Sequence, residues 1–257
     1  MANLQIYQFP TRSDNYGVLI HDGARGVTAA IDAPDADAIR DEVDRRGWRL
    51  HLIFTTHHHG DHVAGNIALK ERYGATIVGP AKEAAKIPGI DGLVDDGAVI
   101  EFADREIRVM ATPGHTLGHV AYYLADENVV FVGDTLFAMG CGRLFEGTAE
   151  MMWASLARLA ALPETTEVYC GHDYAAANAR FALTIEPDNA ALVARAGEAA
   201  AAARSGTLMP PTSIGRERAT NPFLRVDQRG IRQRVNLPDA PAAEVFAALR
   251  RHKDAFA

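Results

Sequence analysis

The segment of residues 56–62 is dense in side chains that bind metal ions in proteins. It reads Thr-His-His-His-Gly-Asp-His and directly follows Leu50–Phe54, an apolar run that predicts a strand. Because side chains alternate in extended backbone, His57 and His59 should point to one side and His58 to the other. The segment therefore presents two imidazoles to a single point.

Two further candidate ligands, Asp61 and His62, follow where the chain turns into a predicted helix, so they can face a second point nearby. Imidazole and carboxylate groups suit Zn, Fe and Mn. Four groups split two and two cannot complete two metal sites, so further ligands must come from elsewhere. Three glycine-containing loops, each after a predicted strand, supply them, and the candidate ligands there are His115, Asp134 and His172.

A histidine on its own is ordinarily a surface or hydrogen-bonded residue. That interpretation is kept for His21, His51, His58, His119 and His252, of which His58 could still support the site. The remaining five histidines and two aspartates fall in four loops at strand ends. This joint pattern predicts metal binding.

The elements that must position these ligands are short strands alternating with amphipathic stretches over the first two thirds of the chain. We expect strands at residues 4–9, 16–20, 27–31, 50–54, 76–78, 92–94, 99–102, 106–111, 120–124, 129–132 and 167–170. We expect helices at residues 36–46, 63–73 and 151–162. The strands at 92–94 and 99–102 could pair as a hairpin across Asp96-Gly97, a favoured turn dipeptide.

The sequence changes character after residue 174. Ala-rich, helix-forming stretches at 175–185 and 189–205 have no strand between them, and a Pro-Pro pair and a polar loop follow. A last helix is expected from residue 240 to residue 256. Mixed strands and helices followed by helices alone indicate an α+β fold with a C-terminal helical part.

The composition narrows the class of protein. The 257 residues are 48% apolar and 23% charged, the balance of an ordinary globular chain. We expect a cytoplasmic protein, because no apolar run nears the roughly 18 residues of a membrane span and the N-terminus does not read as a signal peptide. The net charge of −7 argues against sequence-independent nucleic-acid binding. Cys141 and Cys170 are too few for a disulfide framework, and we expect both reduced.

The candidate ligands resemble the signature of the metallo-β-lactamase superfamily, His-x-His-x-Asp-His with a later His, Asp and His. The resemblance spans residues 2–175 and implies an α+β fold, a four-layered αβ/βα sandwich with the metals at one sheet edge. Asp32 is similar to an acid that orients ligands in this superfamily by fixing the tautomer of a ring. The implied ligands are His57, His59 and His115 for one metal, Asp61, His62 and His172 for the second, and Asp134 as a bridge between them.

Within the superfamily, three further stretches are most similar to glyoxalase II, the hydroxyacylglutathione hydrolases. Residues 140–147 resemble the substrate loop of that family, 220–225 a segment of its C-terminal domain, and 249–254 its closing basic helix. Some members have Lys and Tyr where this chain has Arg143 and Phe145. Arginine keeps the charge, whereas Phe145 lacks a hydroxyl group. The implied substrate-binding residues are Arg143, Phe145, Tyr174, Arg250 and Lys253.

The resemblance also implies the domain organisation and the reaction. It implies a metal-binding catalytic domain at residues 1–174 and a helical substrate-binding domain at 175–257. The reaction would be hydrolysis of the thioester S-D-lactoylglutathione to glutathione and D-lactate, a step of methylglyoxal detoxification. The leaving thiolate needs little protonation, because its thiol has a pKa of about 8.5.

We expect two divalent metal ions per chain, with zinc first and iron or manganese as alternatives. A metal pair can supply hydroxide, because it lowers the pKa of a bound water from about 15.7 to near 7. Asp61 and Asp134 are the expected catalytic residues, and Asp61 would orient the hydroxide. We expect a monomer that binds a small glutathione thioester and neither nucleic acid nor membrane.

Three other interpretations stay open. A persulfide dioxygenase of the same fold would use a single iron on His57, His59 and His115. A lactonase or β-lactamase would need a different substrate wall and would leave the basic residues unexplained. The third is a non-catalytic metal-binding module, but structural zinc sites are usually closed and four-coordinate, whereas seven ligands around two metals leave room for water.

Overall fold

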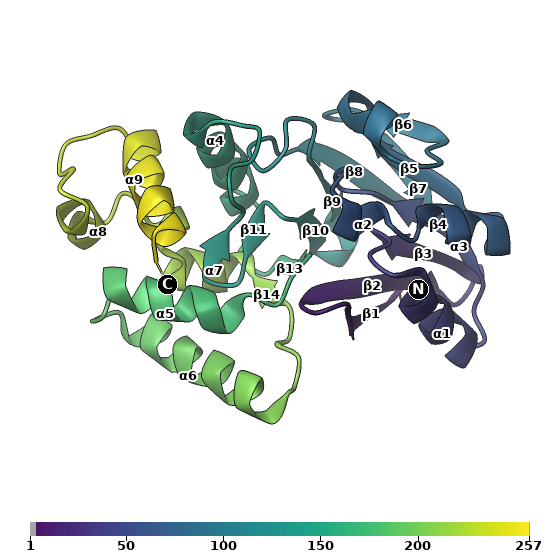
Figure 1. Ribbon diagram of the computed structural model, residues 1–257, viewed down its shortest axis with the longest axis horizontal. Coiled ribbons are helices and arrows are strands. Elements are labelled where there is room, and N and C mark those ends of the chain that lie inside the picture. The colour runs from purple at the N-terminus through teal and green to yellow at the C-terminus, as the bar shows by residue number, and fades with distance from the viewer. Residues whose placement is uncertain (1–3, 257) are drawn as a thin grey trace. The chain divides into compact units, whose positions relative to one another are not determined.

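The computed structural model of the protein describes residues 4–256, and its chain passes back and forth between two units (Figure 1). The first unit holds the described residues up to Ala111 together with Gly118–Gly133. The second unit holds Thr112–Leu117 together with the described chain from Asp134 onward. The predicted domain boundary at residue 174 is a different division, and it stays a prediction.

Six strands of the first unit form one sheet in the order β1-β2-β3-β4-β5-β6. Neighbours are antiparallel from β1 to β3 and parallel from β3 to β6. The change of direction follows from the connections, because tight turns join the first three strands and helical segments join the others. Their bounds are β1 (Leu4–Thr11), β2 (Asn15–Asp22), β3 (Val27–Ile31), β4 (Leu50–Phe54), β5 (Thr76–Pro80) and β6 (Gly92–Val94).

Helix α1 (Ala36–Arg45) packs on this sheet, and local sequence fixes where it starts. The side chain of Asp35 caps it by accepting two backbone N–H groups, at 2.9 and 3.0 Å. Such a cap satisfies donors that the first helical turn leaves open. Ile39 and Val43 are four residues apart, so they share one face of the helix, and both are buried in a core with Leu50 of β4.

The predicted helix at residues 63–73 is wrong at its start, because two helices lie there. They are α2 (Gly60–Val63) and α3 (Asn66–Tyr73). Gly65 separates them: its N–H donates to the carbonyl of Ala33 at 2.8 Å, and a Cβ at this position would lie 2.9 Å from the nitrogen of Ala36. The close approach of two backbone segments therefore interrupts a sequence pattern that favours one helix.

Four more strands of the first unit form an antiparallel run in the order β7-β8-β9-β10. Phe54 of β4 packs against Phe102 and Tyr122, whose ring centroids lie 6.3 and 5.5 Å away. The Tyr122 hydroxyl donates to the carbonyl of Thr55 at 2.7 Å. The two sheets thus face each other around an aromatic core. The bounds are β7 (Val99–Phe102), β8 (Arg105–Ala111), β9 (Val120–Leu124) and β10 (Val129–Gly133).

The expected hairpin of residues 92–94 and 99–102 does not form. Strand β6 pairs with β5, and β7 pairs with β8. The turn at Asp96-Gly97 is present, with the N–H of Ala98 donating to the carbonyl of Asp95 at 3.1 Å, but it leads from one sheet to the other. A turn dipeptide predicts a change of direction and not the strands that it joins, and burial of Phe102 against Phe54 decides the pairing here.

The second unit is mostly helical. Its small strands pair as β11 with β12 and as β13 with β14, both antiparallel. Helices α5 and α6 pack through small residues, which let two backbones approach closely, and this core includes Ala179, Ala182 and Ala196. Helices α4 and α9 meet where Trp153 lies 6.4 Å from Phe246. The bounds are β11 (Leu136–Phe137), β12 (Gly140–Cys141), α4 (Ala149–Ala160), β13 (Glu167–Cys170), α5 (Ala175–Ile185), α6 (Ala190–Ser205), β14 (Thr212–Ser213) and α9 (Ala242–Asp254).

The segment that follows the Pro-Pro pair was expected to be a polar loop, and that expectation is wrong. It folds into α7 (Ile214–Thr220) and α8 (Arg229–Arg234). These helices are too short to show a period in their apolar residues, although each buries one isoleucine, Ile214 or Ile231. The other short helical turns of the chain are η1 (Ala81–Lys86), η2 (Ala125–Glu127) and η3 (Pro222–Leu224).

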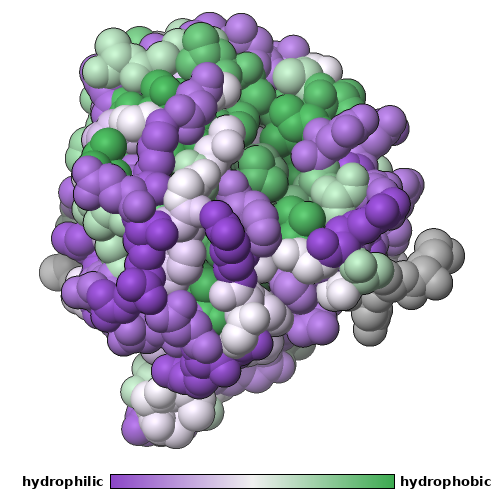
Figure 2. Space-filling view, turned by 90° about the vertical axis from the view of Figure 1, so that its right-hand side faces the viewer, coloured by the Kyte–Doolittle hydropathy of each residue, from purple (hydrophilic) through white to green (hydrophobic). Residues whose placement is uncertain are grey.

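Figure 2 views the molecule from the right-hand side of Figure 1, where β5, β6 and α3 lie. Hydrophobic residues gather towards the upper part of this face, and hydrophilic residues cover much of the rest. The exposed apolar side chains include Ile67 of α3 and Leu93 of β6. Among residues 4–256, no helix combines the length and the apolar character that a membrane crossing requires.

Candidate metal centre and substrate loop

The His-rich segment lies after β4, where the chain of the first unit leaves the sheet and enters α2. His57 is fully buried, and its Nε2 atom lies 3.1 Å from Nδ1 of His59. His58 turns the other way, because its backbone N–H and its Nδ1 atom both lie within 2.8 Å of the carboxylate of Glu83. The structure therefore agrees with the alternation predicted from the sequence. The ring of His62 joins the group at 4.1 Å from that of His57.

Asp32, which directly follows β3, contacts Thr56 and the candidate ligand His62. It is buried, and its carboxylate accepts hydrogen bonds from the backbone N–H of Thr56 at 2.7 Å and from its hydroxyl at 2.8 Å. Nδ1 of His62 donates to the same carboxylate at 2.8 Å. This bond fixes the tautomer of His62 and leaves its Nε2 atom for a metal ion.

Asn15 holds Asp61 in place from the turn between β1 and β2. Its buried side-chain amide donates to the carbonyl of Asp61 at 3.1 Å and to one carboxylate oxygen at 3.2 Å. The same oxygen lies 3.7 Å from Nε2 of His62. Asn15 is not among the site residues expected from the sequence, because no residue pattern links two segments so far apart in the chain.

The second unit carries the other three candidate ligands. One carboxylate oxygen of Asp134 lies 3.4 Å from Nε2 of His115 and 3.3 Å from Nε2 of His172. All three side chains are buried. The Nδ1 atom of His115 donates to the carbonyl of Arg143 at 2.8 Å, so the Nε2 atom is left for a metal ion. A carboxylate between two imidazoles suits the bridging role implied for Asp134.

The spacing of the donor atoms within each unit fits divalent metal ions. Two ligands of a tetrahedral zinc, each about 2.0–2.1 Å from the ion, lie about 3.3 Å apart. The pairs measured above fall around this value: 3.1 Å for His57 and His59, and 3.3 Å for His172 and Asp134. His57, His62 and Asp32 also form a group whose ligand-type atoms all lie within 4.8 Å of one another. The chemistry of these donors therefore suits metal ions.

The backbone next to Asp134 has no room for a larger residue. A Cβ on Gly142 would lie 1.9 Å from the carbonyl oxygen of Asp134. Such a distance is shorter than any real contact of this kind, so the chain can take this path only with glycine. Gly142 therefore brings the start of the loop that contains Arg143 against Asp134, and one residue later the Arg143 carbonyl contacts His115.

The predicted substrate residues of the second unit differ in how they are held. Phe145 is 61% exposed and meets the ring of His115 edge-on, with centroids 5.2 Å apart. Tyr174 stacks on the ring of His172 at 4.8 Å. Arg143 is exposed, and its Nε lies 3.5 Å from the carboxylate of Asp254. Two aromatic rings thus lie against two of the candidate ligands.

Arg250 and Lys253 lie on α9, and neither is a plain solvated charge. Arg250 is only 6% exposed; its guanidinium donates to the carbonyl of Cys141 at 3.0 Å and to the carboxylate of Asp254 at 2.8 Å. Partial burial lowers the pKa of Lys253, and the positive charges of Arg250 and Arg180 lower it further. Arg143, Arg250 and Lys253 therefore lie near a single carboxylate, that of Asp254. The excess of positive charge there favours the binding of an anion.

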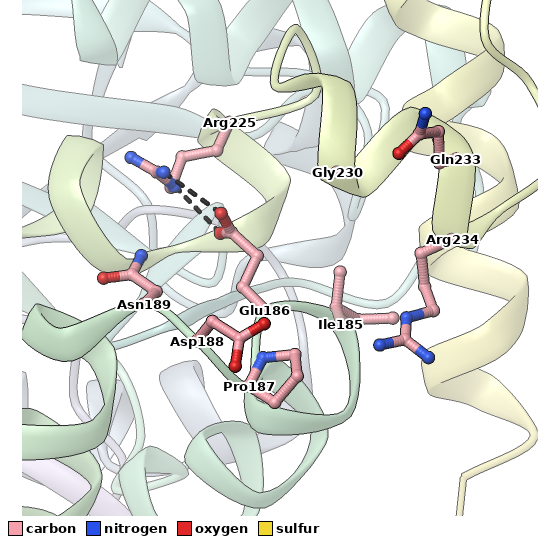
Figure 3. A pocket seen from close by; sticks show the side chains of 9 residues that line it. All are labelled: Ile185, Glu186, Pro187, Asp188, Asn189, Arg225, Gly230, Gln233 and Arg234. Atoms are coloured by element: carbon pink, nitrogen blue, oxygen red, sulfur yellow. Dashed lines mark hydrogen bonds and ion pairs between the residues drawn. The ribbon is translucent and has the colours of Figure 1, made fainter.

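A pocket of about 790 Å³ opens elsewhere in the second unit (Figure 3). It lies between the end of α5 and helix α8, and the ion pair of Arg225 with Glu186 lines it. Arg234 also points into this region. None of the predicted ligand or substrate residues is among its lining residues, so this pocket and the predicted substrate residues are separate features.

Comparison with known proteins gives matches along nearly the whole chain. Residues 31–172 match the model of the metallo-β-lactamase superfamily, and residues 173–256 match the model of the hydroxyacylglutathione hydrolase C-terminus. A hydroxyacylglutathione hydrolase of Brucella anthropi is 58% identical over 98% of this chain and 97% of its own length. One of Rhizobium meliloti is 53% identical over the full length of both chains.

A solved structure, that of ETHE1 from Myxococcus xanthus, has the same fold with a TM-score of 0.67. It is 29% identical in sequence, and the match covers 98% of this chain and 99% of that one. The expected fold class, an α+β sandwich of the metallo-β-lactamase type followed by a helical part, is confirmed. With its family models, its full-length relatives and its clustered histidines and aspartates taken together, the chain belongs to the hydroxyacylglutathione hydrolase family of the metallo-β-lactamase superfamily.

Proposed function

We propose that this protein is a hydroxyacylglutathione hydrolase, which hydrolyses S-D-lactoylglutathione to glutathione and D-lactate in methylglyoxal detoxification. The observation that carries the proposal is the full-length similarity, at 53–58% identity, to relatives of that name. The His and Asp side chains that lie together in the first unit, and Asp134 between His115 and His172 in the second, support it, because such groups suit metal-assisted hydrolysis.

We assign the metal ligands as implied by the family resemblance, for two divalent ions per chain with zinc as the first choice. One hydrogen bond in each unit supports this assignment. Asp32 accepts from Nδ1 of His62, and the Arg143 carbonyl accepts from Nδ1 of His115, so the Nε2 atom of each ring is left for a metal ion. When bound, the metal pair would supply a Lewis acid and a water of lowered pKa. The assigned ligands are His57, His59, Asp61, His62, His115, Asp134 and His172.

Side chains of the protein would supply the other functions that the hydrolysis requires. Asp61, whose carboxylate accepts a hydrogen bond from Asn15, would orient a water beside the metal ions. Asp134 lies between two imidazoles, and its negative charge favours binding of cations there. The departing thiolate derives from a thiol of pKa about 8.5, so no side chain has to protonate it.

Glutathione carries two carboxylates, and the basic side chains of the second unit suit them. Arg143 and Lys253 are the accessible cations of the predicted set, whereas Arg250 is mostly buried and orders the loop at Cys141. The ring of Tyr174 would pack against the substrate beside His172. Phe145 supplies apolar contact only, since it has no hydroxyl group. We further propose a cytoplasmic monomer, with neither nucleic acid nor membrane as a partner.

Purified protein should hydrolyse S-D-lactoylglutathione with release of free thiol, which can be followed directly. The variant Asp134→Ala should lose bound metal and nearly all turnover, because it removes the buried carboxylate that is assigned to the metal ions. Asp104→Ala is the matched control, since Asp104 is exposed and, among residues 4–256, forms a surface ion pair with Arg25 alone. Full activity of metal-free protein, or of Asp134→Ala, would refute the proposal.

A further inference from the structure

A buried ion pair joins two helices of the second unit. Arg195 of α6 and Glu217 of α7 are 3% and 0% exposed, and the Arg195 guanidinium donates to one oxygen of Glu217. Arg195 also donates to the hydroxyls of Thr212 and Thr220, each at 2.6 Å. Desolvation of two charges offsets much of their attraction, so a buried ion pair is a weak source of stability. The arrangement calls for another explanation.

The second oxygen of Glu217 faces the turn between β11 and β12. It accepts the backbone N–H of Met139 and the side-chain amide of Asn221, both at 2.9 Å. The Asn221 amide also donates to the carbonyl of Gly140 at 2.9 Å. Met139 has φ +56°, a region that a methionine adopts only where its surroundings hold it there. Glu217 and Asn221 thus hold the turn through both a donor and an acceptor of its backbone.

The β11–β12 hairpin lies between the groups assigned to catalysis and to substrate binding. Its first strand follows Asp134 by two residues, and its second strand leads into the loop of Arg143. The carbonyl of Arg143 fixes the tautomer of His115, and the carbonyl of Cys141 accepts a hydrogen bond from Arg250. A shift of this hairpin would therefore move the assigned metal ligand Asp134 and, with Arg143, both the carbonyl that contacts His115 and a side chain assigned to substrate binding.

We propose that Glu217 and Asn221 are positioning residues, which hold the β11–β12 hairpin so that Asp134 and Arg143 keep their places. Arg195 balances the charge of Glu217, so that its carboxylate can accept four hydrogen bonds while fully buried. This role gives a physical reason for the stretch of residues 220–225, which contains neither a predicted ligand nor a predicted substrate residue. The expected effect of these residues on catalysis rests on the proposed function, whereas their effect on the position of the hairpin does not.

Asn221→Asp is the most selective variant. Oδ1 of Asn221 accepts the N–H of Phe223 at 3.0 Å, and an aspartate keeps that acceptor. The substitution removes the donor to Gly140 and places a second carboxylate against Glu217. Glu217→Gln is a second variant of nearly the same volume, which has one acceptor oxygen in place of two.

Asn189→Asp is the matched control. Asn189 also caps a helix, by accepting the N–H of Leu192 at 3.2 Å, and its amide donates to the carbonyl of Ala219 at 2.9 Å. The chemical change is identical and falls in the same unit. Neither of these contacts involves the β11–β12 hairpin.

Hydrogen exchange followed by mass spectrometry tests the structural part without any activity. In Asn221→Asp, amides of residues 137–147 should exchange at least several-fold faster than in the parent protein. Peptides of α5 and α6 should be unchanged, and Asn189→Asp should leave residues 137–147 unchanged. Equal exchange of residues 137–147 in the parent, in Asn221→Asp and in Glu217→Gln would overturn the proposal.

A double-mutant cycle tests the kinetic part. Asn221→Asp should lower kcat/KM for S-D-lactoylglutathione by roughly 10-fold to 100-fold, the range expected when a reacting group is misplaced by about 1 Å. The loss should be much smaller in the Arg143→Ala background, because the loop has then lost one of the groups that it positions. Independent, additive losses would overturn the positioning role. A parent protein that does not hydrolyse the thioester, with faster exchange in Asn221→Asp, would contradict only the proposed function.

Discussion

Asp32 has φ +58° at the end of β3, in a region of backbone conformation that few residues other than Gly, Asn and Asp adopt. The residue is only 5% exposed, and its carboxylate accepts three hydrogen bonds, two from Thr56 and one from His62. This backbone conformation therefore directs the Asp32 carboxylate towards the ring of His62. Residues with such strained geometry cluster at functional sites, which agrees with the place of Asp32 beside the candidate ligands.

Replacing Asp32 by Asn should weaken metal binding by about 10-fold to 100-fold, the usual effect of losing a partner behind a metal-binding histidine. An amide has one acceptor oxygen, so it cannot serve both the Thr56 groups and His62. Competition with a chelator of known affinity measures the change. The exposed Asp104→Asn should bind metal as the parent does, and an unchanged affinity in Asp32→Asn would contradict the account.

At the level of single residues, the alternation of side-chain directions was predictable from the sequence, and contacts with distant parts of the chain were not. The opposite directions of His57 and His58 follow from alternation alone, and the structure agrees. The partner of His115 is a backbone carbonyl, that of Arg143, and any residue type supplies one. Asn15 reaches Asp61 across 46 positions of sequence, which no local pattern reveals.

At the scale of elements, Asp91 ties two parts of the first unit together just before β6. Its carboxylate accepts the backbone N–H of Ile77 of β5 at 2.9 Å and pairs with Lys70 of α3. These two contacts, the hydrogen bond first, lower the pKa of Asp91 below its ordinary value. The ionised form is therefore favoured in the folded state.

The stability that Asp91 contributes should depend on pH with a definite sign. A carboxyl whose pKa falls on folding stabilises the protein above its unfolded value of about 3.9, and the contribution is lost as pH falls through the folded value. The difference in free energy of unfolding between the parent and Asp91→Asn should thus be largest near neutral pH and shrink in acid. Urea unfolding of both proteins at several pH values measures it.

The control for this series is Asp104→Asn, which removes only an exposed ion pair with Arg25 and should change stability little at any pH. A difference between the parent and Asp91→Asn that grew towards acid pH would contradict the assigned contacts. High salt should reduce the part due to Lys70, because that pair is partly exposed and screened.

Long, periodic elements were predictable from sequence, and tertiary contacts decided the rest. The predicted helix at 175–185 is observed as α5 with the same bounds. The helix expected at 63–73 is interrupted at Gly65 by the close backbone of Ala36. Strand β6 pairs with β5 and not across the turn with β7, because Phe102 of β7 is buried against Phe54. In each failure the deciding partner lies far away in the sequence.

At the scale of the whole molecule, the negative net charge does not describe the charge distribution around Lys253, which is positive. The chain carries a net charge of −7, yet burial and then the positive charges of Arg250, Arg180 and Arg143 lower the pKa of Lys253, while Asp254 opposes them. This part of an acidic protein is therefore basic, which would favour the binding of an anion. The hydroxyacylglutathione hydrolases that match this chain over nearly its full length are named for a small anionic thioester, which fits a basic surface.

The central claim is that hydrolysis of S-D-lactoylglutathione depends on metal ions held by this chain. The most direct measurement strips the protein of metal, adds zinc, iron or manganese in steps, and records bound metal and turnover on the same sample. The account predicts negligible turnover without metal and a rise that levels off at a pair of ions per chain, with glutathione and D-lactate as products. Undiminished hydrolysis by the stripped protein, or no hydrolysis at full metal occupancy, would contradict it.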